Sequence, residues 1–532
     1  MRLKFCGAAQ TVTGSSFLVS VADRHILIDC GLYQGSKALQ ERNYGPFPFS
    51  PNEIDAVVLT HAHIDHSGLL PKLVKQGFRG PIYATEPTKD LCSIMLADSA
   101  HIQETEVERK NRKLARQDKP LLTPIYTVAD AQATMEQFEA VEYYRRVALF
   151  PNVVAVLRPS GHMLGAALIE LHVLEGDERT TLLFTGDLGA TDRPIVPDPE
   201  KPGGPDFVIM EATYGDRERQ EPEDSYAQLA RIIKDTFRRG GNVIIPAFAV
   251  ERTQDLLYGL NRLIHRGALA PQHVYVDSPL AVEATRVFAR HVDLFDEEAQ
   301  RFRHITGDVP IHFPNLHFVH TPQESMQLNR IKSGAVIISA SGMCTAGRIK
   351  HHLKHNLWRP ESSVVFVGYQ AQGSLGRQIV DGEPLVRIHG EYVKVRAQIH
   401  QLEGFSAHAD QRELVEWVTH LERCPRAVFL VHGEESALST LQELLRRKLG
   451  VPIEVPAHLS EYTLAETSTQ IDCGRAARAV QPTLWSTTRQ LVDVLRELER
   501  ADIPTEELTA FLAQAEALRQ EAARTLRDGT AA

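Results

Sequence analysis

The chain contains the stretch Thr60-His61-Ala62-His63-Ile64-Asp65-His66-Ser67-Gly68, in which three histidines and an aspartate fall within six residues. It directly follows an apolar run at residues 56–59, and that run predicts a buried strand. Imidazole nitrogens and carboxylate oxygens are the ligands that zinc prefers in proteins. The spacing lets His61 and His63 reach one ion, while Asp65 and His66 lie a turn later and can face a second. The alternative, a polar loop with Asp65 as a helix cap, does not account for so many ligands in one place.

Length and composition limit the class of protein. A chain of 532 residues is long for one core and predicts two or more domains. Its net charge of -10 argues against a general nucleic-acid coat protein, but it permits a local basic cleft. The chain shows neither a signal peptide nor an apolar run of the roughly 20 residues that span a bilayer. The six cysteines form no C-x-x-C pair. We therefore expect a cytoplasmic protein with no membrane partner.

Three further candidate ligands follow predicted strands. Asp29 ends a strand at residues 25–29 and can orient a ligand histidine from behind, although a turn-capping role fits as well. His162 lies between glycines just after a strand at residues 153–157. Asp187 ends another buried strand, and one carboxylate can bridge two cations about 3.5–4 Å apart. Strands that alternate with such loops indicate a sandwich whose ligand loops open at one edge.

The second half of the chain has a different pattern. Residues 191–206 are rich in proline, glycine and charge, which indicates a linker. A strand at residues 207–211 ends on Glu211. Helices and strands then alternate over residues 224–340, which predicts a parallel sheet and an α/β domain. Ser341 and Gly342 follow one of these strands, where small residues let backbone N–H groups approach a phosphate, although a plain tight turn fits equally well.

Two segments have a less specific composition. Residues 88–150 are helix-rich, and the strongly charged part at 99–116 is better explained as a solvated helix face than as a binding surface. Long insertions beside a site can also act as lids or substrate walls. Residues 486–499 and 505–527 predict two amphipathic helices, which can pack on the body of the protein or on a second subunit.

The chain resembles the metallo-β-lactamase superfamily, whose successive motifs match, in order, Asp29, residues 61–66, His162, Asp187 and His432. Glu211, His408 and His432 resemble the three extra motifs of its β-CASP nucleases. A closer resemblance, to the branch typified by the nuclease subunit of the cleavage and polyadenylation specificity factor and its prokaryotic relatives, rests on four segments. These are residues 246–257 (PAFAVERTQDLL), 368–377 (GYQAQGSLGR), 404–410 (GFSAHAD) and 431–436 (VHGEES). The resemblance covers roughly residues 1–460. It implies RNA as substrate, because DNA-acting relatives tend to carry an apolar residue at the position of His432.

The resemblance implies an α/β architecture in four parts. A metallo-β-lactamase αββα sandwich would begin in residues 1–206 and be completed by residues 386–462. A β-CASP domain with a parallel sheet would be inserted as residues 207–385. A C-terminal helical extension at residues 463–532 lies outside the resemblance.

The resemblance also implies a zinc-dependent ribonuclease in RNA processing or degradation, with two Zn²⁺ and a bridging hydroxide that attacks the RNA phosphodiester. The implied ligands are His61, His63 and His162 for one ion, Asp65, His66 and His432 for the other, and Asp187 as the bridge. His408 would be the general acid, since its ordinary pKa near 6.5 suits that role, and Glu211 would orient it. Asp29 would orient a ligand histidine.

Substrate contacts and partners are less determined. Arg252, Arg377 and the Ser341-Gly342 turn are candidates for binding RNA phosphates, with ordinary surface and turn residues as the alternative. The expected partner is RNA, in single-stranded form, and a homo-oligomer is possible. A DNA nuclease of the same family, a small-molecule ester or thioester hydrolase and a non-catalytic RNA-binding scaffold are the competing hypotheses. The sequence leaves open whether cleavage is internal or proceeds from the 5′ end.

Overall fold

The structure is a computed structural model that describes residues 1–218 and 222–464. The two helices predicted at residues 486–499 and 505–527 lie outside the described residues. Within the described ranges the chain forms two seven-stranded sheets, a six-stranded sheet and a two-stranded ribbon. No helix in this part of the chain is both long and apolar enough to cross a membrane.

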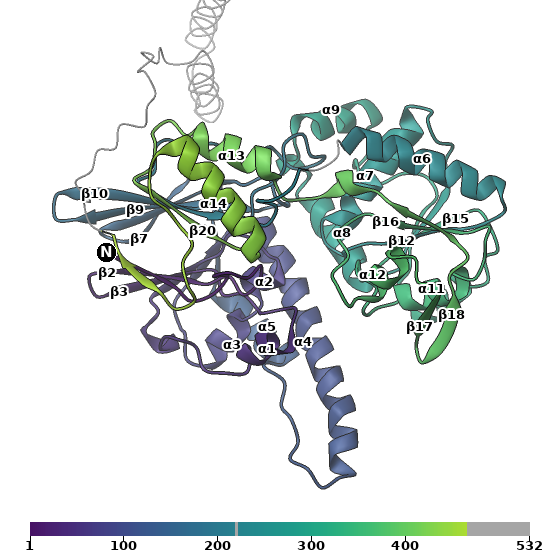
Figure 1. Ribbon diagram of the computed structural model, residues 1–532, viewed down its shortest axis with the longest axis horizontal. Coiled ribbons are helices and arrows are strands. Elements are labelled where there is room, and N and C mark those ends of the chain that lie inside the picture. The colour runs from purple at the N-terminus through teal and green to yellow at the C-terminus, as the bar shows by residue number, and fades with distance from the viewer. Residues whose placement is uncertain (219–221, 465–532) are drawn as a thin grey trace, which may run out of the picture. The chain divides into compact units, whose positions relative to one another are not determined.

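The first two sheets lie face to face (Figure 1). The first has the order β22 (Glu461–Thr463), β1 (Arg2–Phe5), β2 (Phe17–Val21), β3 (Arg24–Ile28), β4 (Ala56–Val58), β5 (Ile82–Ala84) and β6 (Phe138–Ala140). The second has the order β21 (Ile453–Glu454), β20 (Ala427–Val431), β11 (Phe207–Glu211), β10 (Glu178–Phe184), β9 (Ala167–Glu175), β8 (Val153–Pro159) and β7 (Arg146–Phe150). Apolar side chains of both sheets fill the space between them, among them Phe5, Phe17, Phe184 and Phe429.

Helices cover the outer faces of these two sheets (Figure 1). Those on the side of the first sheet are α1 (Lys37–Arg42), α2 (Ile64–Ser67), α3 (Leu70–Lys75), α4 (Glu86–Ala115) and α5 (Val128–Thr134). Those over the second sheet are α13 (Gln411–Thr419) and α14 (Glu435–Leu449). The layers are therefore helix, sheet, sheet and helix, and the predicted αββα sandwich is confirmed.

The third sheet is parallel, as the alternating pattern predicted. Its order is β14 (Leu316–Phe318), β13 (His273–Val276), β15 (Ala335–Ser339), β12 (Val243–Pro246), β16 (Ser363–Phe366) and β19 (Gln398–Gln401). Every residue of β12, β15 and β16 is buried, which is typical of a parallel sheet with helices on both faces. The accompanying elements are α6 (Pro222–Arg238), α7 (Arg252–His265), α8 (Pro279–Arg290), α9 (Glu297–Thr306), α10 (Pro322–Leu328), α11 (Ile349–Asn356), α12 (Leu375–Val380), β17 (Leu385–Ile388) and β18 (Glu391–Lys394).

Strand pairing differs from the expected boundaries at two places. Strand β11 pairs with β10 and β20 of the sandwich, although residues 207–385 were assigned to the inserted domain. Strand β19 pairs with β16 in the third sheet, although it follows residue 385. The composition of a strand indicates burial but not which strand it will pair with, so the chain changes sheets later than expected on both occasions.

The long helix α4 explains the charged segment at residues 99–116. Its outer part carries exposed ion pairs one helical turn apart, Lys110 with Glu106 and Arg112 with Glu108. Nearer its start, Asp90 accepts a hydrogen bond from His291 at 2.8 Å, just after α8. The helix thus presents a solvated face to water and packs against α8 beside the third sheet.

Candidate metal centre

The candidate ligands lie where strands of the two facing sheets end. Asp29 follows β3, residues 60–66 follow β4, and His162, Asp187 and His432 follow β8, β10 and β20. Asp29 and His432 have positive φ values of 59° and 50°, a conformation that non-glycine residues rarely adopt. Such strained residues gather at functional sites, where the surrounding structure holds them in place.

The first cluster brings together His61, His63, His162 and Asp187. His63 Nδ1 lies 3.2 Å from His61 Nε2 and 3.1 Å from His162 Nε2. Asp187 Oδ2 lies 3.4 Å from Nε2 of both His61 and His162. Metal–nitrogen bonds of 2.0–2.1 Å in a tetrahedron place the ligand atoms about 3.3–3.4 Å apart, so these four atoms have the spacing that a zinc ion requires.

The second cluster brings together Asp65, His66 and His432 on the other side of Asp187. His432 Nε2 lies 3.3 Å from His66 Nε2 and 3.4 Å from Asp65 Oδ2. The second carboxylate oxygen of Asp187, Oδ1, lies 3.2 Å from His66 Nε2. Asp187 therefore directs one oxygen to each cluster. Its Oδ1 atom is buried without a hydrogen-bond partner among the described residues, which is costly unless a cation is bound there.

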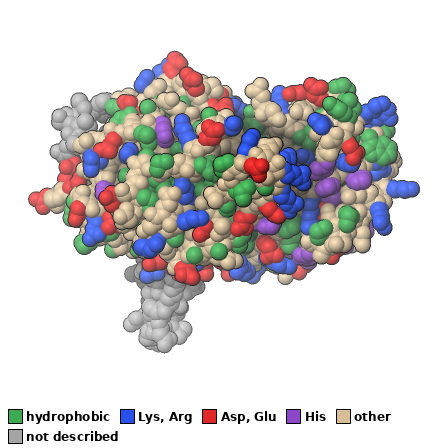
Figure 2. Space-filling model, turned by 90° about the horizontal axis from the view of Figure 1, so that it is seen from below, with side chains coloured by type: hydrophobic (Ala, Val, Ile, Leu, Met, Phe, Trp, Pro, Cys, Tyr) green, Lys and Arg blue, Asp and Glu red, His purple; other side chains and the backbone are tan. Residues whose placement is uncertain are grey.

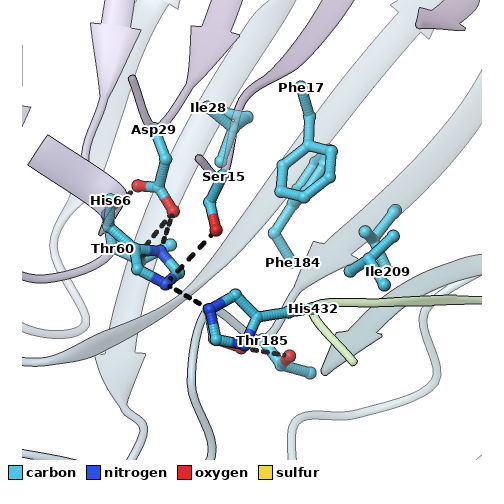
Figure 3. Close-up of a pocket in the computed structure, with 12 residues that line it drawn as sticks. Ser15, Phe17, Ile28, Asp29, Thr60, His66, Phe184, Thr185, Ile209 and His432 are labelled. Carbon is cyan, nitrogen blue, oxygen red and sulfur yellow. Dashed lines mark hydrogen bonds and ion pairs between the residues drawn. The ribbon is translucent and has the colours of Figure 1, made fainter. Parts of the chain in front are cut away.

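Hydrogen bonds behind the ligands fix the orientation of their rings. His66 Nδ1 lies 2.7 Å from Asp29 Oδ2, and this leaves Nε2 to face the cluster. His61 Nδ1 lies 3.0 Å from Thr60 Oγ1, and His432 Nδ1 lies 3.0 Å from Thr213 Oγ1. Figure 3 shows Asp29, Thr60 and His66 together, with the His432 ring facing His66. Such partners hold ligand rings in place and raise metal affinity.

The protonation states of the ligand side chains favour the binding of a cation. Burial lowers the pKa of His61 and His63, that of His63 to about 4, so both rings offer a neutral nitrogen at physiological pH. Burial alone would raise the pKa of Asp187, but the nearby histidines His432, His66, His61 and His162 hold it well below its usual value. Neutral imidazoles and an ionised carboxylate are the forms that bind a divalent metal.

A further histidine lies beside the first cluster. The His408 and His162 ring centroids are 4.6 Å apart. His408 Nδ1 lies 3.1 Å from both carboxylate oxygens of Glu211, which is fully buried. Burial lowers the pKa of His408, but Glu211 outweighs it and raises the pKa to about 10. The Glu211 carboxylate also accepts the Leu188 N–H at 2.5 Å, so the loop after β10 is tied to this pair. Glu211 thereby favours the protonated form of His408 through Nδ1, and Nε2 has no hydrogen-bond partner among the described residues.

Arg193 connects this centre to the helix α7 beside the third sheet. It was not identified from the sequence, because it lies in the segment interpreted as a linker. Its guanidinium donates hydrogen bonds to the carbonyl oxygen of His162 and to the carboxylates of Glu251 and Asp255. It is 5% exposed. The supposed linker is therefore packed in part, around Arg193, Ile195 and Val196. The sequence carried no local signal that Thr213 and Arg193 are site residues.

The residues that the sequence suggested for phosphate binding lie in different environments. Arg252 begins α7 and is 7% exposed, and its Nε and Nη1 atoms have no hydrogen-bond partner among the described residues. Arg377 is half-exposed and pairs with Asp381, one turn later at the end of α12. Ser341 Oγ accepts the N–H of Ala346, and Gly342 lies against Phe248. Arg252 Nη2 lies 4.0 Å from Glu251 Oε1, so Nε and Nη1 are the atoms of Arg252 that an anion would reach.

Comparisons with known proteins match three parts of the chain. A metallo-beta-lactamase superfamily domain matches residues 18–179, a Beta-Casp domain residues 253–379, and a Zn-dependent metallo-hydrolase RNA specificity domain residues 392–456. Ribonuclease TTHA0252 from Thermus thermophilus is 41% identical over 445 residues, which cover 84% of this chain and 96% of that protein. Transcription termination factor FttA from Methanosarcina mazei is 31% identical over 473 residues, which cover 87% of this chain and 72% of that protein.

A solved structure gives the same fold. A protein of unknown function from Enterococcus faecalis superposes with a TM-score of 0.52 at 14% identity, over 87% of this chain and 99% of that one. At this identity the likeness concerns the fold alone.

Proposed function

The chain belongs to the β-CASP family of metallo-β-lactamase RNA nucleases, and from that membership we propose that it is a ribonuclease with a two-ion zinc centre and a histidine general acid. It is a metal-dependent nuclease of RNA processing. The observation that supports the two-ion centre is Asp187, whose two oxygens face separate groups of ligand atoms.

The ligand residues divide into one group for each proposed ion, with one residue shared between them. His61, His63 and His162 would hold one ion, Asp65, His66 and His432 the other, and Asp187 would bridge them. When bound, a pair of divalent cations acidifies a nucleophilic water and neutralises charge on the phosphodiester oxygens. We propose zinc because the ligands are five histidine nitrogens and two carboxylates. Asp29 maintains the orientation of one of these histidines, His66.

His408 would act on the leaving group. Hydrolysis of an RNA phosphodiester expels a ribose oxygen, which needs a proton as the bond to phosphorus breaks. His408 is 21% exposed, and Glu211 stabilises its protonated form through Nδ1, so Nε2 can deliver that proton. Because Glu211 lies on β11 and His408 on the loop before α13, the pair forms only when the sandwich is complete.

Arg252, Arg377 and the Ser341-Gly342 turn are proposed to contact RNA phosphates. The net charge of -10 permits this role only where basic side chains gather locally. On the face shown in Figure 2, acidic and basic side chains are interspersed, and several Lys and Arg side chains gather to the right of the centre. A lost phosphate contact should reduce the salt dependence of RNA affinity by about one in the log–log slope, so Arg377→Ala tests this role.

Three further parts of the proposal concern context: the RNA is single-stranded, the protein forms a homo-oligomer, and it acts in the cytoplasm. The first is developed below. The second is tested by light scattering of the full chain during size-exclusion chromatography, where a monomeric mass would contradict it. The third is tested by fractionating cells that produce the protein.

One assay separates the proposed function from its alternatives. Metal-loaded full-length protein is incubated with end-labelled single-stranded RNA, DNA of the same sequence and a generic thioester, with Asp187→Asn as the inactive control. We expect cleavage of RNA alone, and elemental analysis should find two zinc ions per chain. Preferential cleavage of DNA or of the thioester would contradict the substrate, and a different metal or a single ion would contradict the centre.

A further inference from the structure

Two aromatic rings of the inserted domain are half-exposed at the ends of neighbouring strands. Phe248 is 47% exposed and Tyr369 is 52% exposed. Burial of an aromatic side chain stabilises a fold, so rings left half in water contribute little to it. These two follow β12 and β16, which pair with each other in the parallel sheet.

The segments that carry the two rings both contact one turn at the carboxyl end of that sheet. The turn after β15, the other neighbour of β12, lies between them. A Cβ atom on Gly342 would lie 3.2 Å from the Phe248 ring, and Gln370 Nε2 donates a hydrogen bond to the Gly342 oxygen at 3.1 Å. Ligands of open α/β sheets bind at this edge.

A short row of side chains leads away from the proposed general acid. The Tyr214 ring meets the His408 ring edge-on, with centroids 5.7 Å apart. The Arg217 guanidinium lies over the Tyr214 ring at 5.3 Å. The pKa of Arg217 is raised mainly by its hydrogen bond with Asp216.

We propose that Phe248 and Tyr369 form a stacking site for unpaired RNA bases, on a path that leads past Arg217 and Tyr214 to His408. This inference rests on the proposed function and names the form of its substrate. Every base has a flat π-face, and stacking on aromatic side chains binds single strands without regard to sequence. Arg217 and Arg377 each form an ion pair with a neighbouring aspartate, so a phosphate on this path would compete with Asp216 and Asp381 for them. Bases within a duplex are already stacked and paired, so this site selects single strands.

The test compares variants of the full-length, metal-loaded protein. Phe248→Ala and Tyr369→Ala remove one ring each, Tyr369→Phe keeps the ring without its hydroxyl, and Tyr392→Ala is the control. Tyr392 lies on β18 of the same domain and is 70% exposed. The substrates are a single-stranded RNA, the same RNA with abasic positions beside the cleaved bond, and bis(4-nitrophenyl) phosphate, a diester without bases. Circular dichroism shows whether each variant is folded.

Stacking of one base contributes about 5- to 150-fold in binding, so each alanine variant should raise KM for RNA by a factor in that range. Tyr369→Phe and Tyr392→Ala should leave KM unchanged. Abasic RNA should bind wild type and the alanine variants alike. An unchanged KM for the intact RNA in both alanine variants, or an equal rise for abasic RNA, would overturn the stacking site. Failure of wild type to cleave RNA, with the nitrophenyl diester still hydrolysed, would instead overturn the proposed function.

Discussion

Arg193 and Asp255 form an ion pair with a nitrogen–oxygen distance of 2.7 Å, although the two side chains are only 3% and 6% exposed. Arg193 lies in the segment after β10, and Asp255 lies in α7 beside the third sheet. The same guanidinium donates a hydrogen bond to the carbonyl oxygen of His162. One side chain thus joins a metal-ligand loop of the sandwich to a helix of the inserted domain.

Arg193→Met should destabilise the protein by about 3–5 kcal/mol, because it removes the ion-pair partner of the buried Asp255 and leaves the buried Glu251 with only the more distant Arg252, at 4.0 Å. The measurement is urea unfolding of the full chain. Adding Asp255→Asn to the variant should recover part of the loss, since the two residues are directly coupled. A loss below about 1 kcal/mol would mean that water reaches these carboxylates.

His408→Ala should keep both metal ions and reduce RNA cleavage about 10²- to 10⁴-fold, the usual contribution of general acid catalysis. The nitrophenyl diester, whose leaving group needs no proton, should lose much less. Elemental analysis and initial rates measure both effects. His400→Ala, a histidine on β19, is the control. Loss of metal from His408→Ala would show that His408 is a ligand, as its place beside Asp187 and Glu211 also allows.

Asp29→Asn should weaken metal binding about 10- to 100-fold, because the carboxylate that orients His66 becomes neutral. Asparagine is chosen because Asp29 has a φ of 59°, which asparagine tolerates. Competition with a chelator measures the affinity. Asp23→Asn, in the exposed turn between β2 and β3, should bind metal as wild type does. Equal affinities in the two variants would exclude the orienting role.

A fall in pH should lower the free energy of unfolding of the inserted domain by protonating the Asp277 carboxylate. Burial raises the pKa of this carboxyl, but hydrogen bonds from His352, Ser325 and Arg348 outweigh burial and lower it below its ordinary value. A lowered folded-state pKa contributes stability that is complete above the unfolded value of about 3.9 and is lost as pH falls below it. The difference in free energy of unfolding between wild type and Asp277→Asn should therefore be constant above about pH 5 and shrink below about pH 4. A difference that grows on acidification would contradict this sign.

Removal of metal should lower the unfolding temperature, because the ligands then remain clustered without the cation that they suit. A metal present at 100 times its dissociation constant stabilises the fold by about 2.7 kcal/mol per site. Thermal unfolding in zinc and in chelator measures the shift. The double variant His61→Ala with His66→Ala removes a ligand from each cluster and should show no zinc-dependent shift. A shift that persists in the double variant would place the stabilising metal elsewhere.

The sequence by itself determined the features that depend on residues close together in the chain, namely buried strands and the loops that follow them. The ligands at residues 61–66 share one short loop, and Asp29, His162, Asp187, Glu211 and His432 each follow a buried apolar run, so their place at strand ends could be predicted. Only the tertiary structure decided which elements meet. It placed Thr213 behind His432 and turned a proline-rich segment into the support for Arg193. It also paired β11 with the sandwich and β19 with the third sheet. Local composition sets burial and turns, whereas pairing between distant segments depends on packing that no short stretch encodes.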